Sequence, residues 1–172
     1  MKNGEIVDYT TTNSPLGKLL LGATAGGVCL VDFIDDNEPS VVIESLNRRW
    51  RVQFSDRKNK HLDRLTIQLS EYFAGQRSKF NLPIIFQGTP FQVSVWKALQ
   101  QIPFGKTICY AEQAALVGRP RSFRAVAQAN GANPIGIVVP CHRVIGKSGN
   151  LTGYGGGLWR KQFLLELEGV EV

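Results

Sequence analysis

The chain has 172 residues, of which 43% are hydrophobic and 20% are charged, a balance typical of a globular protein with one large domain or two small ones. We expect no membrane span, because the longest apolar stretch, residues 19–31, is short and broken by glycines. We also expect no signal peptide, because the start, MKNGEIVDYTTT, lacks an apolar core. The three cysteines form no disulfide framework and indicate a reducing, cytoplasmic compartment.

The net charge of +6 is unevenly placed along the chain. Residues 1–82 carry 11 Lys or Arg against 10 Asp or Glu, a net of +1, whereas residues 83–172 carry 9 against 4, a net of +5. Between Lys97 and Lys161 the only acid is Glu112. The second half is therefore the candidate for contact with a polyanion, although a basic surface without a partner fits the charge equally well.

The first half predicts a mixed sheet with flanking helices. Strands are expected at residues 6–9, 17–22 and 28–33, with an Ala-Gly-Gly turn between the last two. Helices are expected at residues 39–50, which begin with a proline, and 61–73, whose apolar residues recur at helical spacing before Gly75. The extended residues 80–86 are interpreted as a linker.

The second half predicts mostly helix. Thr89 and Pro90 begin a helix with an apolar stripe, and two short helices at residues 110–117 and 122–130 form a helix-turn-helix, the second capped by Ser122. An apolar strand at residues 135–139 ends at Pro140, and a final helix covers residues 159–167. The predicted fold class is α+β, with an N-terminal sheet domain at residues 1–82 and a mostly helical C-terminal domain at residues 83–172.

Residues 138–145, VVPCHRVI, place a thiol beside an imidazole. A cysteine is a strong nucleophile only as thiolate, and its ordinary pKa of about 8.5 means that it needs a base nearby. The side chains of Cys141 and His142 diverge in an extended loop, so we expect a relay through a water rather than a direct bond. Glu168, at the edge of the apolar face of the last helix, is the best candidate to orient His142, although its spacing alone favours an ordinary charge at a helix end.

Other uses of the cysteines and histidines are less favoured by spacing. Cys29, Cys109 and Cys141 lack the paired spacing of a zinc site, so we expect no bound metal. Cys29 lies in a predicted strand and Cys109 precedes a helix, so both are interpreted as small buried residues. His61, at the start of a helix, is interpreted as structural.

Residues 139–145, VPCHRVI, resemble the active-site signature of the O6-alkylguanine-DNA alkyltransferases, also called methylated-DNA–protein-cysteine methyltransferases. Further stretches resemble the family at its spacing: residues 101–106 (QIPFGK), Tyr110, residues 124–126 (RAV), 132–134 (ANP), 153–158 (GYGGGL) and 167–169 (LEG). The resemblance is close over residues 86–169. The first half is similar only in its general layout, which implies a ribonuclease-H-like domain.

This resemblance implies direct DNA repair, in which an alkyl group moves irreversibly from guanine O6 in double-stranded DNA to a cysteine of the protein. Cys141 is then the acceptor, His142 is the base acting through a water, and Glu168 orients His142. No cofactor or metal is implied, and the thioether product makes the reaction single-use. The resemblance further implies roles for Tyr110 at the lesion base, Asn133 as a hinge to the active-site loop, Lys161 beside the site, and Arg143 as a loop-holding residue.

By the same resemblance, the helix pair binds the minor groove and Arg124 enters the stack where the flipped guanine was. The backbone of Val144 and Gly155 holds the guanine in a pocket that includes Tyr154 and Gly136. Because some relatives carry proline where Gly136 stands, we predict a roomier pocket that accepts groups larger than methyl. The residues expected at the DNA are Tyr110, Arg119, Arg121, Ser122, Arg124, Ala125 and Ala129.

Two other functions compete with this one. A module that binds lesions without chemistry would lack the cysteine, which is present here as Cys141. A cysteine hydrolase would need a direct dyad, for which adjacent Cys141 and His142 have poor geometry. We expect a monomer located in the cytoplasm, or at the nucleoid in a bacterium. Repair of alkylthymine and cooperative binding of several copies to DNA stay open at this point.

Overall fold

The computed structural model describes residues 4–35 and 37–171 and divides into two compact units, Met1–Gln87 and Gly88–Val172. The division lies after Gln87, whereas the sequence placed it after residue 82. The reason is that the predicted linker pairs with a strand of the first unit: Val28 N–H donates to the Pro83 carbonyl at 2.9 Å, and Ile85 N–H donates to the Val28 carbonyl at 2.8 Å.

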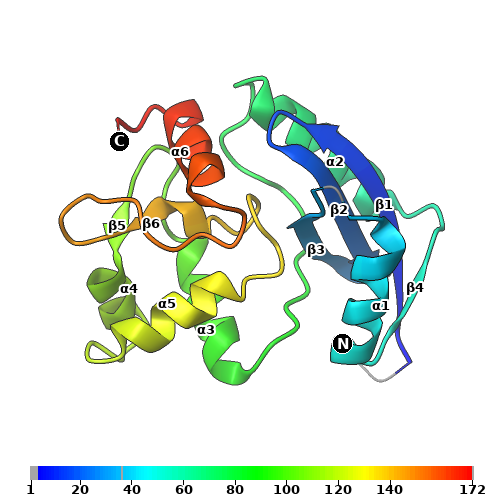
Figure 1. Ribbon diagram of the computed structural model, residues 1–172, viewed down its shortest axis with the longest axis horizontal. Helices are drawn as coiled ribbons and strands as arrows, with labels where there is room; N and C mark the ends of the chain where they lie inside the picture. Colours follow the sequence, from blue (N-terminus) through cyan, green and yellow to red (C-terminus); the bar gives the residue numbers. More distant parts are fainter. Residues whose placement is uncertain (1–3, 36, 172) are drawn as a thin grey trace. The chain divides into compact units, whose positions relative to one another are not determined.

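The first unit contains a four-stranded sheet in the order β3-β2-β1-β4 (Figure 1). Strands β1 (Ile6–Ser14), β2 (Gly17–Thr24) and β3 (Gly27–Phe33) are antiparallel neighbours, and the short β4 (Gln53–Ser55) runs parallel to β1. Strand β1 continues past the predicted end at residue 9 because its threonines pair with β2 as far as Ser14. The prediction ended this strand too early because the threonines are polar, although β-branched residues favour strands.

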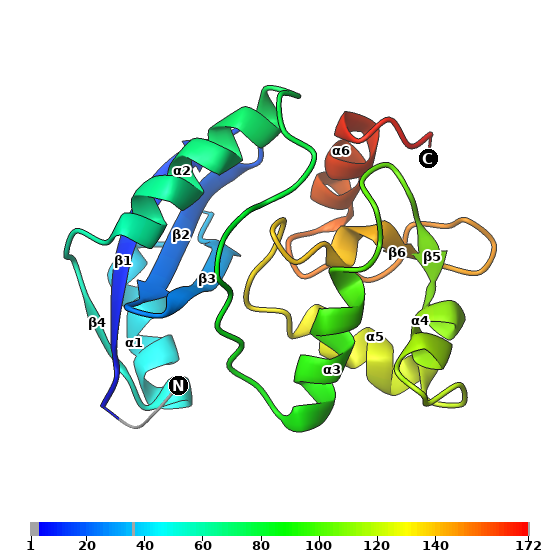
Figure 2. The same cartoon turned by 180° about the vertical axis from the view of Figure 1, so that it is seen from behind.

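Two helices cover the two faces of this sheet, α1 (Pro39–Trp50) in front in Figure 1 and α2 (Lys60–Phe73) in front in Figure 2. Leu46 and Trp50 of α1 pack with Val7, Leu20 and Leu30 in one core cluster. Both helices were predicted from sequence, and Gly75 follows α2 with a φ of 71°, as expected of a glycine after a helix C-terminus.

The second unit is mostly helical, as predicted. Its elements are α3 (Pro90–Leu99), β5 (Ile108–Cys109), α4 (Tyr110–Leu116), α5 (Phe123–Gly131), the 3₁₀ turn η1 (Cys141–Arg143), β6 (Val144–Ile145) and α6 (Leu158–Leu167). Thr89 forms a capping box with Gln92. Ser122 occupies the N-cap position of α5, but its side chain makes no capping hydrogen bond.

Helices α4 and α5 form the predicted helix pair and are joined by a buried amide contact. Gln113 Nε2 donates to Asn130 Oδ1 at 3.1 Å, and Asn130 Nδ2 donates to Gln113 Oε1 at 2.7 Å. Trp96 of α3 donates its indole N–H to the Ala129 carbonyl at 2.7 Å. These three side chains fix the helix pair on α3. None of the described helices is long and apolar enough to cross a membrane.

The predicted strand at residues 135–139 is wrong, because these residues form a tight turn. Val139 N–H donates to the Ile135 carbonyl at 2.9 Å, and the Asn133 side chain satisfies two further backbone groups. Its Oδ1 accepts from Ile135 N–H at 3.1 Å, and its Nδ2 donates to the Val139 carbonyl at 2.8 Å. Apart from a single β-bridge residue at Ile135, the segment therefore has local partners in place of a neighbouring strand. The expected extended loop at Cys141 is a 3₁₀ turn.

Candidate active site

Cys141 begins η1 and is almost buried, with 9% of its surface exposed. Asn133 Nδ2 lies 3.4 Å from its sulfur, within hydrogen-bonding distance for Sγ, while also binding the Val139 carbonyl. The residue predicted as a hinge thus links the C-terminal end of α5 to the thiol. A short η1 turn, rather than an extended strand, presents Cys141 and His142 in different directions.

His142 is fully buried and forms a hydrogen bond with Glu168, with 2.9 Å between Nε2 and Oε1. The other ring nitrogen, Nδ1, has no hydrogen-bond partner among the described residues. Burial lowers the pKa of His142 below its ordinary value, and the hydrogen bond with Glu168 offsets this only in part. The ring is therefore neutral at pH 7, with one nitrogen tied to a carboxylate and the other available.

Arg143 is the main partner of Glu168. It binds the carboxylate with two donors, Nε to Oε2 at 2.8 Å and Nη2 to Oε1 at 2.9 Å, and its Nη1 donates to the Ile102 carbonyl at 2.6 Å. Burial alone would raise the pKa of Glu168, but the hydrogen bonds from His142 and Arg143 lower it to about 2. Glu168 is thus an ionised acceptor, and His142 Nε2 donates to it.

The Gly105 amide completes the surroundings of Glu168 by donating to Oε2 at 3.1 Å. Gly105 has a φ of 70°, and a Cβ built there would lie 2.9 Å from the Glu168 carbonyl oxygen. Both facts favour glycine at this position. The QIPFGK stretch therefore contributes backbone groups of Ile102 and Gly105 to the buried cluster.

Lys161 is fully buried and lies near the thiol. Its Nζ donates to the carbonyls of Val144 at 2.6 Å and Thr152 at 2.7 Å, and lies 5.9 Å from the centre of the Tyr110 ring. Burial lowers the pKa of Lys161 to about 8, opposed by the charge of Cys141. Tyr110 donates its hydroxyl to the Thr152 carbonyl at 3.0 Å, and burial raises its pKa.

The loop before α6 carries two of the predicted pocket residues, Tyr154 and Gly155. Two side chains hold this loop at its ends: Lys161 binds Thr152, and Arg160 donates to the Gly156 carbonyl at 2.9 Å. The Arg160 guanidinium also lies 4.7 Å from the centre of the Trp159 ring. Sequence reasoning missed Arg160, because its partner is a backbone carbonyl in the loop before α6 and leaves no sequence signal.

The remaining pocket residues lie on two other segments. Val144 is buried at the start of β6, and Gly136 is half-buried in the turn before Cys141. The carbonyl of Val144 is already bound by Lys161 Nζ at 2.6 Å. Val144 and Lys161 therefore lie side by side.

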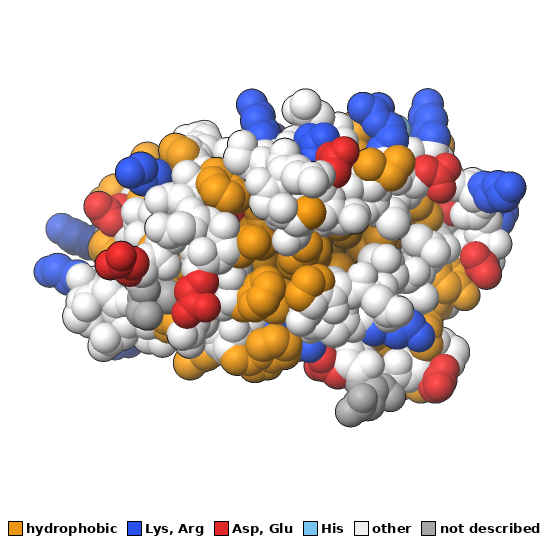
Figure 3. Space-filling view, turned by 90° about the horizontal axis from the view of Figure 1, so that it is seen from above, with side chains coloured by type: hydrophobic (Ala, Val, Ile, Leu, Met, Phe, Trp, Pro, Cys, Tyr) orange, Lys and Arg blue, Asp and Glu red, His pale blue; other side chains and the backbone are white. Residues whose placement is uncertain are grey.

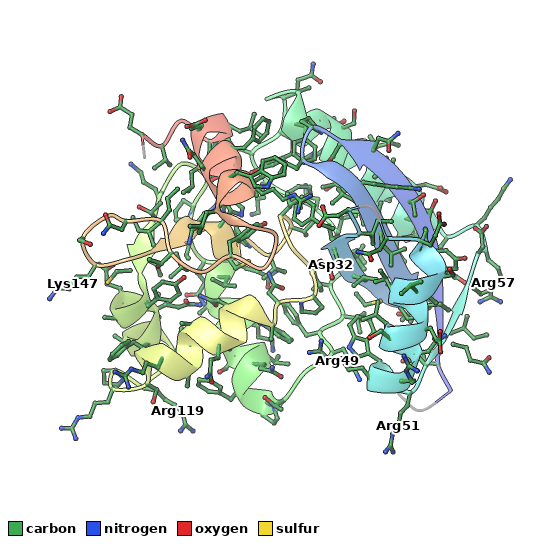
Figure 4. All side chains as sticks on the ribbon, in the orientation of Figure 1. Asp32, Arg49, Arg51, Arg57, Arg119 and Lys147 are labelled. Carbon is green, nitrogen blue, oxygen red and sulfur yellow. The ribbon has the colours of Figure 1, made fainter. Side chains whose placement is uncertain are left out.

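The residues predicted at the DNA divide between exposed and buried. Arg119, Arg121, Arg124 and Ala125 are exposed on the α4–α5 turn and α5, and Ser122 is half-buried. Figure 4 shows Arg119 projecting away from this turn, and basic side chains stand out singly on the face drawn in Figure 3. Ala129 contradicts the prediction, because it is only 3% exposed and faces the core with Val126 and Asn130.

Two family profiles match the two halves of the chain. The profile described as "6-O-methylguanine DNA methyltransferase, ribonuclease-like domain" covers residues 7–86, and "6-O-methylguanine DNA methyltransferase, DNA binding domain" covers residues 90–170. The chain belongs to the 6-O-methylguanine DNA methyltransferase family. The family resemblance seen in residues 86–169 is confirmed and extends over the first half.

Individual relatives agree with the family. A methylated-DNA--protein-cysteine methyltransferase of Methanosarcina barkeri is 43% identical over 161 residues, 93% of this chain and 96% of the relative. The constitutive protein of that name from Bacillus subtilis is 41% identical over 166 residues, 93% of this chain and 94% of the relative.

Solved structures of relatives confirm the α+β fold class. An O6-methylguanine methyltransferase of Mycobacterium tuberculosis superposes with a TM-score of 0.79 at 44% identity, covering 94% of this chain and 92% of that one. A structure of Mycobacterium tuberculosis OGT in complex with DNA has the same TM-score and coverage at 42% identity.

Proposed function

We propose that this protein repairs DNA directly by transferring an alkyl group from O6-alkylguanine in double-stranded DNA to its own Cys141. The observation that carries the proposal is the buried pair of His142 and Glu168, with 2.9 Å between Nε2 and Oε1, directly after the almost buried Cys141 in the chain. The thiolate sulfur attacks the alkyl carbon, the carbon–oxygen bond breaks, and the electron pair stays on the guanine, which takes up a proton. The thioether product has no good leaving group, so each molecule reacts once.

The proton of the thiol leaves through His142. Because ionised Glu168 accepts from Nε2, the neutral imidazole presents Nδ1 as an acceptor, and this atom has no partner among the described residues. A water between Sγ and Nδ1 is the proposed carrier of the proton. Arg143 keeps Glu168 ionised and fixed, so it acts through the carboxylate and is a positioning residue.

Lys161 and Tyr110 are proposed to stabilise the charges of the reaction. With a pKa of about 8, Lys161 is largely cationic at pH 7 and lies where a thiolate at Cys141 would favour its charge. The Tyr110 hydroxyl and Lys161 Nζ both donate to the Thr152 carbonyl, and this shared acceptor holds the hydroxyl beside the loop that precedes α6.

The DNA must deliver the guanine out of its stack, because O6 lies inside the duplex. We assign the exposed guanidinium of Arg124 to the gap left by the flipped base and Arg119, Arg121, Ser122 and Ala125 to contacts in and beside the minor groove. The flipped guanine is held by the backbone at Val144 and Gly155, beside Tyr154. Ala129 is excluded from this surface by its burial.

We also propose that the pocket accepts groups larger than methyl, because Gly136 has no side chain to narrow it. Transfer rates for methylguanine and benzylguanine in one oligonucleotide test this. Comparable rates are expected, and a benzyl rate vastly below the methyl rate would reject the proposal.

We further propose a monomer located in the cytoplasm. The three free cysteines support the location alone, because thiols stay reduced in that compartment.

The test of single use is mass spectrometry of the intact protein after successive additions of duplex containing methylguanine. One methyl group per chain, unchanged by a second addition, is expected. Tight lesion binding without any mass gain would favour a binding module instead.

A further inference from the structure

Ile137, four residues before the thiol, has an unusual backbone conformation. Its φ is 67°, in the left-handed region that β-branched residues rarely adopt. Val138 N–H donates to the Gly136 carbonyl at 2.7 Å, which closes a three-residue turn around Ile137. A positive φ combined with this hydrogen bond defines the rare and strained form of the γ-turn.

Burial of the side chain holds this strained turn in place. Ile137 is 1% exposed, and its neighbours Ile135 and Val139 are fully buried. If the backbone relaxed to negative φ, the Ile137 side chain would leave its buried site. Strain of this kind persists only where surrounding contacts determine the conformation, and it gathers at functional sites.

The turn at Ile137 leads directly to the thiol through the Val139 carbonyl. This oxygen accepts from Asn133 Nδ2 at 2.8 Å, and the same Nδ2 lies 3.4 Å from Cys141 Sγ. The Val139 carbonyl oxygen also accepts from Cys141 N–H at 2.9 Å, which closes an inverse γ-turn around Pro140, whose φ and ψ are −83° and 66°. One carbonyl therefore orients both the backbone of Cys141 and the amide that touches its sulfur.

We propose that Ile137 is a positioning residue for alkyl transfer, whose packed γ-turn sets the Val139 carbonyl and thereby the place of Cys141 Sγ. The inference rests on the proposed function. It assigns to Ile137 no contact with the base, the thiol or the DNA. Its effect is confined to the geometry of attack, where a displacement of about 1 Å can change a rate on the order of 100-fold.

Three substitutions at this residue separate backbone strain from packing. Ile137→Val keeps the buried branched side chain, so its transfer rate at saturating lesion duplex stays within about twofold of wild type. Ile137→Ala keeps the strain but loses the packing that opposes it, so the turn relaxes and the rate falls by about tenfold or more. Ile137→Gly removes the strain as well, so it transfers at least about threefold faster than Ile137→Ala.

The decisive readout is which of Ile137→Gly and Ile137→Ala transfers the alkyl group faster. If loss of packing were the only effect, the glycine variant would be the slower of the two. Binding of undamaged duplex, measured on the same proteins, is expected to change less than about twofold, which places the effect in the transfer step. A folded Ile137→Ala protein with the wild-type rate, or an Ile137→Gly protein no faster than Ile137→Ala, would overturn the inference.

The neighbouring Ile135, equally buried but without positive φ, provides the matched control for stability. At residue 137 glycine is expected to melt roughly 2–4 °C above alanine, and at residue 135 below it. The same order at both positions would contradict strain at Ile137. Absence of alkyl transfer by the wild-type protein would overturn the proposed function itself, whereas wild-type transfer without the predicted order overturns only this inference.

Discussion

The second unit contains two functional regions built on opposite principles. In the first, the buried Glu168 carboxylate accepts hydrogen bonds of 2.8–3.1 Å from segments far apart in the chain. On the α4–α5 turn, the arginines are exposed and make few contacts within the protein; Arg119, for example, lies 5.7 Å from the centre of the Phe91 ring. Substitutions in the buried region should therefore affect chemistry and stability together, whereas those in the exposed region should affect only the steps that involve duplex DNA, namely binding and base flipping.

Cys141→Ser is expected to separate the functions of the two regions, alkyl transfer and DNA binding, most completely. A serine hydroxyl stays protonated beside His142 and is a far weaker nucleophile, so transfer should be undetectable while DNA binding by the exposed arginines is retained. Single-turnover transfer and duplex binding measured side by side check this. Loss of binding together with transfer would show that the two regions are not independent.

Glu168→Gln should affect both rate and stability. The neutral amide leaves the Arg143 guanidinium buried without its counter-charge, which costs on the order of 3–5 kcal/mol, and it no longer holds His142 in the required tautomer. Urea unfolding and single-turnover transfer measure the two effects. Glu166→Gln, an exposed carboxylate on the same helix, is the control and should change neither. A Glu168→Gln protein that is inactive but as stable as wild type would contradict the stabilising role of the ion pair between Arg143 and Glu168.

Stability should also depend on pH through the same cluster. Glu168 has a folded pKa of about 2 against roughly 4.3 when unfolded, so its contribution of roughly 3 kcal/mol is present above pH 4.3 and lost as the pH falls toward 2. His142 has a lowered folded pKa, so the unfolded chain gains a proton first and stability falls as the pH drops below about 6.5. His142→Gln should remove the slope just below pH 6.5, as measured by unfolding at several pH values; an unchanged slope would contradict neutral burial.

A smaller and purely DNA-dependent effect is expected at Arg124. Arg124→Ala should slow transfer from duplex DNA about tenfold, because nothing then fills the gap left by the flipped base, and leave transfer from the free alkylguanine base unchanged. Single-turnover rates on both substrates decide this. An equal loss on both would remove Arg124 from base flipping.

The smallest effect is expected at Arg119. Arg119→Ala should weaken binding to all sequences and reduce the slope of binding against salt by about one unit, since one phosphate contact is lost. Arg49→Ala, at another exposed arginine on α1 of the first unit, is the matched control (Figure 4). Equal effects of the two variants would mean that overall charge, rather than this surface, attracts the DNA.

Local signals predicted much of this structure, and long-range pairings account for what they missed. The capped helix at Thr89, the glycine after α2 and the two short helices follow from nearest neighbours in sequence. Strands β4, β5 and β6 have only two or three residues, and partners elsewhere in the fold define them. The apolar run at residues 135–139 could not be told from a strand without knowing that Asn133 binds its backbone.

The candidate site shows the same limit. Motif and resemblance predicted roles for Cys141, His142 and Glu168, but the two hydrogen bonds from Arg143 to Glu168, 25 residues away, have no local signature. The error at Ala129 was avoidable, because Val126, Ala129 and Asn130 follow the helical spacing of a buried face. Burial of a small residue on a short amphipathic helix should be considered before a role in close approach to DNA.

Whether Cys141 is the residue that accepts the alkyl group can be decided by peptide mapping with mass spectrometry after one equivalent of duplex with O6-methylguanine. We expect a single methyl group on the peptide that contains Cys141, and unmodified peptides for Cys29 and Cys109. A methyl group on either of those cysteines, or an unmodified Cys141 in protein that binds the lesion tightly, would contradict it.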